Sequence, residues 1–142
     1  SLLRDDRKCK VIVMGDMNDD PSNRSMLECL MAKPEKNEVR KGEMYNPWYN
    51  ILVKEGRGTL SYRGAWNLFD QIVITPNLID YKGKAKLKRL KYIKSDIFLR
   101  PYLLNAEGKY RGTPKRTTAR KVWLNGYSDH LPVVLYLAKD TK

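Results

Sequence analysis

The chain has 142 residues, of which 42% are apolar and 31% charged, a balance that fits one folded globular domain and not a disordered chain. No apolar run approaches the ~18 residues needed to cross a bilayer, so we expect no membrane span. The net charge of +12 favours anionic partners such as nucleic acid, phosphorylated compounds or anionic lipid heads, and a solvated basic surface is an equally good reading of charge alone.

The first predicted strand covers residues 10–14, where a short continuous apolar run is typical of a strand buried on both faces. Asp20 and Pro21 then predict a helix start, with the aspartate as N-cap. Apolar residues spaced three and four apart extend this helix to about Lys33. The charged stretch at residues 34–42 predicts a loop.

The middle of the chain is predicted to alternate between a short helix and strands. Residues 44–53 carry several aromatic side chains and predict a short helix that these side chains dock. Residues 59–62 and 68–74 then read as two strands, linked by a turn at residues 63–64.

Further strands are predicted near residues 90–93 and 97–99, and a closing strand at 131–137. Between them, residues 105–126 are rich in Gly, Lys, Arg and Thr and predict a long loop with an ordered centre, a feature that is often functional. A helix followed by several strands predicts an α/β layered fold, and not a doubly wound sheet with a helix after every strand.

Asp16 and Asn18 follow the first strand and are two residues apart. If strand geometry continues through them, both side chains point to the same side of the sheet. A carboxylate beside an amide can orient a water molecule and hold a phosphoryl oxygen. The alternative is that acids here make a turn and cap the helix, which explains Asp19 and Asp20 better than Asp16 and Asn18.

Asp70 lies within an apolar strand, where a charged side chain is costly to bury unless it is paired. An edge-strand acid that faces water is an equally good reading. His130 is the only histidine and precedes Leu131-Pro132 at the start of the closing strand. Alone it is more often structural than catalytic, but a hydrogen bond to Asp70 would account for both residues. With one histidine, and with Cys9 and Cys29 far apart, no zinc site is expected.

These segments together resemble the signature of the endonuclease/exonuclease/phosphatase superfamily, whose members include deoxyribonucleases, abasic-site endonucleases, sphingomyelinases and inositol polyphosphate phosphatases. The resemblance rests on three ordered segments that span nearly the whole chain: Gly15-Asp16-Met17-Asn18, Phe69-Asp70-Gln71-Ile72 and Ser128-Asp129-His130-Leu131-Pro132. It implies a deoxyribonuclease-like α/β fold, here half of a four-layered α/β sandwich, with a mixed, largely antiparallel sheet and helices on one face.

The resemblance also implies a divalent-metal-dependent phosphoester hydrolase, either a nuclease or a phosphodiesterase or phosphatase. Asp16 would orient or deprotonate the attacking water. Asn18 would hold that water or the phosphorus centre. His130 would bind a phosphoryl oxygen and stabilise its developing charge, and Asp70 would steady the ring.

For the metal, the resemblance implies Mg²⁺, or Mn²⁺, with Asp16 and Asp129 as ligands, since hard oxygen ligands suit these ions. The substrate would be a nucleic acid or a phosphorylated small molecule. We expect Lys115 and Arg116 in the basic loop, together with Asn18, to contact its phosphate or backbone.

In the family, the Gly-Asp-x-Asn segment lies past the middle of the domain, and an earlier Asn and Glu anchor the principal metal. Here the segment begins at residue 15, so residues 1–142 are expected to form the C-terminal half only, and to be inactive alone. The uncovered sheet face would then favour a homodimer. The alternative function is a non-catalytic basic nucleic-acid-binding module whose aromatic side chains stack on bases.

Overall fold

The structure, a computed structural model, describes residues 8–80, 83 and 86–141. These residues form mixed, mostly antiparallel sheets joined by short helical turns. The longest helix among them, α2 (Trp48–Val53), has six residues. The predicted largely antiparallel sheet is confirmed, but the α/β class overstates the helix content, because the described chain is mainly β with little helix.

Ten strands and four further helical turns complete the described chain. The strands are β1 (Ile12–Asp16), β2 (Ala32–Lys33), β3 (Met44–Tyr45), β4 (Leu60–Tyr62), β5 (Ala65–Asn67), β6 (Asp70–Ile74), β7 (Lys91–Ile97), β8 (Thr118–Ala119), β9 (Val122–Trp123) and β10 (Val133–Ala138). The turns are η1 (Ser25–Cys29), η2 (Lys36–Glu38), η3 (Pro76–Leu78) and η4 (Pro101–Leu103).

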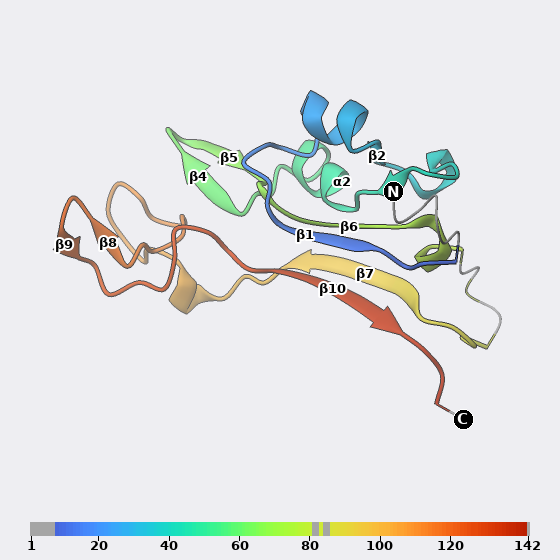
Figure 1. Ribbon diagram of the computed structural model, residues 1–142. Helices are drawn as coiled ribbons and strands as arrows, with labels where there is room; N and C mark the ends of the chain where they lie inside the picture. The colour runs from blue at the N-terminus through green and yellow to red at the C-terminus, as the bar shows by residue number, and fades with distance from the viewer. Residues whose placement is uncertain (1–7, 81–82, 84–85, 142) are drawn as a thin grey trace.

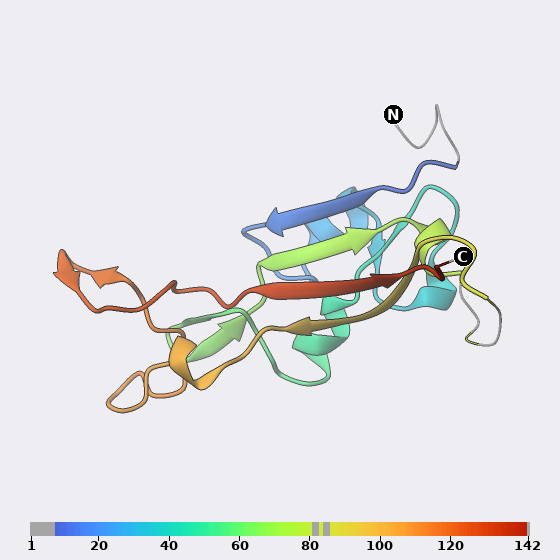
Figure 2. The same cartoon turned by 90° about the horizontal axis from the view of Figure 1, so that it is seen from below.

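The sheet topology brings three strand ends together at one edge of the molecule. The largest sheet has the order β1-β6-β3-β2, and β1 runs antiparallel to β6. A second antiparallel pair, β7 and β10, lies against β6, so that Figure 2 shows β1, β6, β10 and β7 side by side. The end of β1 and the starts of β6 and β10 therefore share one end of the sheets, from which the hairpins β4–β5 and β8–β9 project (Figure 1).

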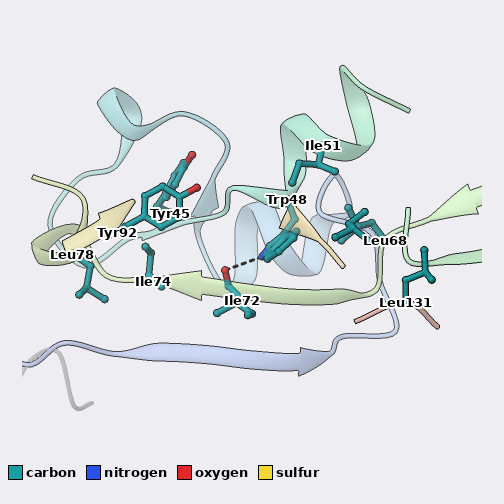
Figure 3. Close-up of a cluster of buried hydrophobic side chains, with 10 residues drawn as sticks. Tyr45, Trp48, Ile51, Leu68, Ile72, Ile74, Leu78, Tyr92 and Leu131 are labelled. Carbon is teal, nitrogen blue, oxygen red and sulfur yellow. Dashed lines mark hydrogen bonds between the residues drawn. The ribbon is translucent and has the colours of Figure 1, made fainter. Parts of the chain in front are cut away.

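The core lies between α2 and the strands, and aromatic side chains hold the helix in place. Trp48 is fully buried, and its indole N–H donates a hydrogen bond of 2.9 Å to the carbonyl oxygen of Ile72 (Figure 3). Tyr45 packs edge to face on Tyr92, with ring centroids 5.6 Å apart. The predicted short helix docked by aromatics at residues 44–53 is thus confirmed, although its first residues form strand β3.

The prediction of a first strand buried on both faces is wrong. Side chains of β1 alternate, as in a strand with one covered face. Val13 packs against a small buried cluster, whereas Ile12 is exposed and Met14 is 71% exposed. The strand therefore presents apolar side chains outward, as expected for an uncovered sheet face, and the homodimer built on that face stays a prediction.

The long helix predicted from Asp20 to Lys33 is also wrong. Only the single turn η1 forms, because Met31 adopts a left-handed backbone (φ 53°) and the following residues pair with β3. Asp20 does not cap a helix. Its carboxylate instead accepts hydrogen bonds from the side chain of Asn67 and the backbone N–H of Leu68, at 2.8 and 2.7 Å.

The turn predicted at Arg63-Gly64 is present, but the strand that follows it is β5, while residues 70–74 pair with β1. The two strands predicted at 90–93 and 97–99 are one strand, β7. The long loop at residues 105–126 has an ordered centre, as predicted, which is the hairpin β8–β9. The closing strand is confirmed as β10.

Two smaller points concern the cysteines and the membrane. Cys9 and Cys29 are free thiols in this structure. In the described part of the chain, no helix combines the length and the apolar character that crossing a bilayer requires.

Candidate active site

Three of the candidate residues meet where β1 ends and β6 begins. Asp16 and Asp70 are direct partners across the antiparallel pair. The ring Nδ1 of His130 lies 2.8 Å from Oδ2 of Asp70 and 4.0 Å from Oδ2 of Asp16. The side chains of His130 and Asp70 are 24% and 21% exposed, so both are largely shielded yet reachable. The predicted contact between His130 and Asp70 is therefore confirmed.

Thr59 stabilises this arrangement, and no motif in the sequence indicates this role. Its side chain is fully buried, and its hydroxyl donates a hydrogen bond of 2.5 Å to Oδ2 of Asp70. Its carbonyl oxygen accepts a 2.7 Å hydrogen bond from the N–H of Leu131, next to the histidine. A Cβ on Gly58 would clash with the carbonyl oxygen of Asn67, so the glycine permits the close approach that places Thr59.

We expect Thr59→Val to lower the free energy of unfolding by about 2 kcal/mol, because Asp70 loses a buried donor to its charged oxygen. Urea denaturation measures the change. The control is Thr118→Val, since the exposed Thr118 side chain forms no hydrogen bond with the described residues. The control should change stability by less than about 0.5 kcal/mol. Equal effects of the two substitutions would contradict the role of Thr59.

Asp16 is fixed by a tight turn that follows β1. The backbone N–H of Asn18 donates a 2.9 Å hydrogen bond to Oδ1 of Asp16, and Asn18 has a left-handed backbone (φ 53°). The expectation that strand geometry continues through Asn18 is therefore wrong. The turn commits one carboxylate oxygen of Asp16 and leaves Oδ2 on the side of His130. The Asn18 side chain is exposed and makes no hydrogen bond with the described residues, so its contact with substrate stays a prediction.

The segment after Asn18 is anchored by Asp19, as the structural reading of that acid expected. The Asp19 carboxylate accepts hydrogen bonds from the hydroxyl of Ser25 and the side-chain amide of Asn23, at 2.5 and 2.6 Å, and these bonds lower the pKa of Asp19. Its carbonyl oxygen accepts a 2.7 Å bond from the fully buried amide of Gln71, which follows Asp70. The loop after β1 and the start of β6 are thus held to each other.

Asp129 pairs with Arg116, one of the two basic loop residues that were predicted to contact phosphate. Nη2 of Arg116 is 3.4 Å from Oδ2 of Asp129, and both side chains are about half exposed. Arg116 is therefore paired with a carboxylate, and its contact with substrate stays a prediction, as does that of Lys115. A Cβ on Gly126 would overlap the carbonyl oxygens of Lys115 and Arg116, so this glycine lets the two segments cross.

The donor set suits magnesium only in part. No group of three or more His, Cys, Asp and Glu that could hold a metal occurs among residues 8–80, 83 and 86–141. Asp16 offers a half-exposed carboxylate, and Asp129 a second one that now binds Arg116. Because Mg²⁺ keeps several waters and is commonly held by one or two carboxylates, these oxygen donors are of a type that suits the ion, and their role as ligands stays a prediction.

Comparison with known proteins identifies one family. A sequence model described as "Endonuclease/Exonuclease/phosphatase family" matches residues 1–139, which include Asp16, Asp70 and His130. No curated protein and no solved structure matches the chain.

Proposed function

The chain belongs to the endonuclease/exonuclease/phosphatase family, and from this premise we propose that it carries the Asp16, Asp70 and His130 part of the active site of a divalent-metal-dependent phosphoester hydrolase. The observation that carries the proposal is the meeting of these side chains at one sheet end. His130 lies 2.8 Å from Asp70 and 4.0 Å from Asp16, although 60 residues or more separate it from either in sequence. Phosphoester hydrolysis is the chemistry that the family membership suggests for such a cluster.

His130 acts on the phosphoryl group in this proposal. With Nδ1 bound to Asp70, the other ring nitrogen, Nε2, is the one left for substrate, and no described residue binds it. In the imidazolium form, Nε2–H donates to a phosphoryl oxygen and stabilises the charge that develops there. Asp70 binds Nδ1 and so fixes the orientation of the ring, and Thr59 in turn fixes Asp70.

Asp16 prepares the water that attacks phosphorus. Its Oδ1 is committed to the turn, and Oδ2 accepts a proton from a water held near the phosphorus atom. The Asn18 amide, two residues along, holds this water or a phosphoryl oxygen by a hydrogen bond. The distance of 4.0 Å between His130 and Asp16 supports a common reacting centre for the attacking and the stabilising groups.

A bound Mg²⁺ or Mn²⁺ would neutralise phosphoryl charge and orient the substrate. Asp16 would hold it, and Asp129 would join once released from Arg116. The principal ligand that the resemblance implies, a glutamate, is not part of this cluster, because no group of three or more His, Cys, Asp and Glu that could hold a metal occurs among the described residues.

The test is hydrolysis of bis(4-nitrophenyl) phosphate by the full-length protein. We expect turnover with Mg²⁺, loss of turnover in EDTA, and a decrease in kcat of about 100-fold in Asp16→Asn, the lower range for removal of a catalytic base. Asp140→Asn, two residues after the end of β10, is the matched control and should leave kcat unchanged. Turnover that survives EDTA or Asp16→Asn contradicts the proposal, and nucleic-acid binding without turnover would favour the non-catalytic module.

A further inference from the structure

A groove of about 820 Å³ lies beside the candidate active site. One side is the turn of the β4–β5 hairpin, and the other comes from the segment of residues 105–129 that contains the β8–β9 hairpin. Both project from the same end of the molecule (Figure 1). Asp129, the neighbour of His130, lines the groove, so the groove leads to the residues of the proposed active site.

The groove carries an uncompensated positive charge. Four cations line it, and Asp129 is the one acid among its lining residues. Arg116 pairs with that acid, but Arg63, Lys109 and Arg120 have no ion-pair partner among the described residues. Cations that line a concave surface with low-dielectric walls focus the field and attract an anionic ligand.

On each side of the groove, an aromatic ring lies beside one of these cations. Tyr62 and Tyr110 line the groove from its two sides and are 58% and 65% exposed. The guanidinium of Arg63 lies 5.1 Å from the ring centroid of Tyr62, and Nζ of Lys109 lies 5.7 Å from that of Tyr110. Each side of the groove therefore presents an exposed ring together with a cation, which is the pairing that a base and its phosphate require.

The hairpin turns fix two of these cations in an uncommon backbone geometry. Arg63 and Arg120 have φ values of 51° and 45°, and Lys121 has 68°. Two-residue hairpin turns favour Asn-Gly at such positions, because a longer side chain with positive φ is strained. Arg63 precedes Gly64 in one turn and Arg120 precedes Lys121 in the other, so in both turns an arginine occupies the first of these positions and places a charge at the tip.

We propose that this groove binds a polynucleotide strand with unpaired bases, its phosphates on Arg63, Lys109 and Arg120 and its bases stacked on Tyr62 and Tyr110. The strand then passes Asp129 toward His130, and this last step rests on the proposed function. Unpaired bases are required because a duplex keeps its base faces stacked on each other and withholds them from the tyrosines. A compact phosphorylated molecule would satisfy the cations but would leave the exposed rings on both sides without a partner.

Fluorescence anisotropy of a labelled single-stranded oligonucleotide of about 16 nucleotides tests this inference, since that length matches the larger single-strand site sizes. Binding to the full-length protein is measured in EDTA, so that it does not depend on turnover. We expect Tyr62→Leu combined with Arg63→Ala to weaken binding about tenfold or more. The slope of log K against log [salt] should fall by about 0.7, the value of one single-strand phosphate contact.

A second variant and a matched control keep the result interpretable. Lys109→Ala with Tyr110→Leu removes the same pair from the other side of the groove and should have a similar effect. Lys94→Ala with Tyr136→Leu removes a pair of the same kind, 4.8 Å apart on β7 and β10 and outside the groove, and should leave affinity unchanged.

The inference is overturned if the control weakens binding as much as the groove variants, or if neither groove variant weakens it. It is also overturned if a duplex of equal length, or vesicles with phosphatidylserine, bind as well as the single strand. Groove-dependent binding without any hydrolysis in Mg²⁺ would support the groove and refute the proposed function. If the protein hydrolyses a small phosphodiester but its affinity for the oligonucleotide does not change in the groove variants, the proposed function is supported and the groove proposal is refuted.

Discussion

His130→Ala is expected to lower the turnover of a phosphodiester substrate by about 1000-fold, the range found when one charge-stabilising or acid–base group is removed from an active site. The ring is the one candidate that contacts Asp70 and also lies near Asp16. Its loss would remove the proposed donor to the phosphoryl oxygen and would leave Asp70 with Thr59 as its remaining side-chain partner among the described residues. The measurement is kcat for bis(4-nitrophenyl) phosphate in Mg²⁺, with denaturation midpoints recorded to verify folding.

A double-mutant cycle separates catalysis by His130 from a structural role. Asp70→Asn should lower kcat as well, because the ring loses the charged carboxylate that binds Nδ1 and stabilises the imidazolium. The double variant should be about as slow as His130→Ala alone, since residues that act as one unit are strongly non-additive. Additive losses, or unchanged turnover in His130→Ala, would contradict the assignment of His130 as a catalytic residue.

Trp48→Ala is expected to lower the free energy of unfolding by about 4 kcal/mol, the middle of the range for removal of a large buried aromatic side chain. Trp48 is fully buried between α2 and β6. The substitution leaves a cavity and also removes the donor to the carbonyl oxygen of Ile72. Because a domain of this size is stable by only about 5–15 kcal/mol, the variant should unfold at a much lower urea concentration.

Trp123→Ala is the matched control, because this tryptophan is exposed on the β8–β9 hairpin. Its effect on unfolding should stay within about 0.5 kcal/mol. Similar unfolding curves for Trp48→Ala and the unsubstituted protein would show that the cluster around Trp48 is not the core that holds α2 on the sheet.

The residues of the candidate site could be found from the sequence because they stand in short segments at strand boundaries. An acid in an apolar strand is costly to bury without a partner, and the lone histidine could supply one. The contact between Asp70 and His130 was predicted on this basis. Thr59 could not be found this way. Threonine is common in strands, and its hydroxyl reaches Asp70 through a contact between side chains 11 residues apart that no local pattern encodes.

The fold was predicted well where the local pattern and the tertiary contacts agree, as in β10 and in the turn at Arg63-Gly64. It was predicted poorly after β1. The spacing of apolar residues there favours a helix, but Asp20 binds Asn67 and Leu68 across the sheet, which holds the chain in a loop. The apolar run of β1 did not reveal that one of its faces is exposed, because periodicity alone does not say what covers a strand.

The direct pairing of Asp16 with Asp70 has a consequence for how the molecule folds. Like charges opposite each other on neighbouring strands oppose the pairing of those strands. The final residue pair of the β1–β6 ladder is therefore locally frustrated, while the apolar pairs Ile12–Ile74 and Val13–Val73 at its other end are not. The ladder is expected to close from its apolar end and to open first at the acidic end. The geometry of the candidate active site would then be among the last features to form and the first to be lost.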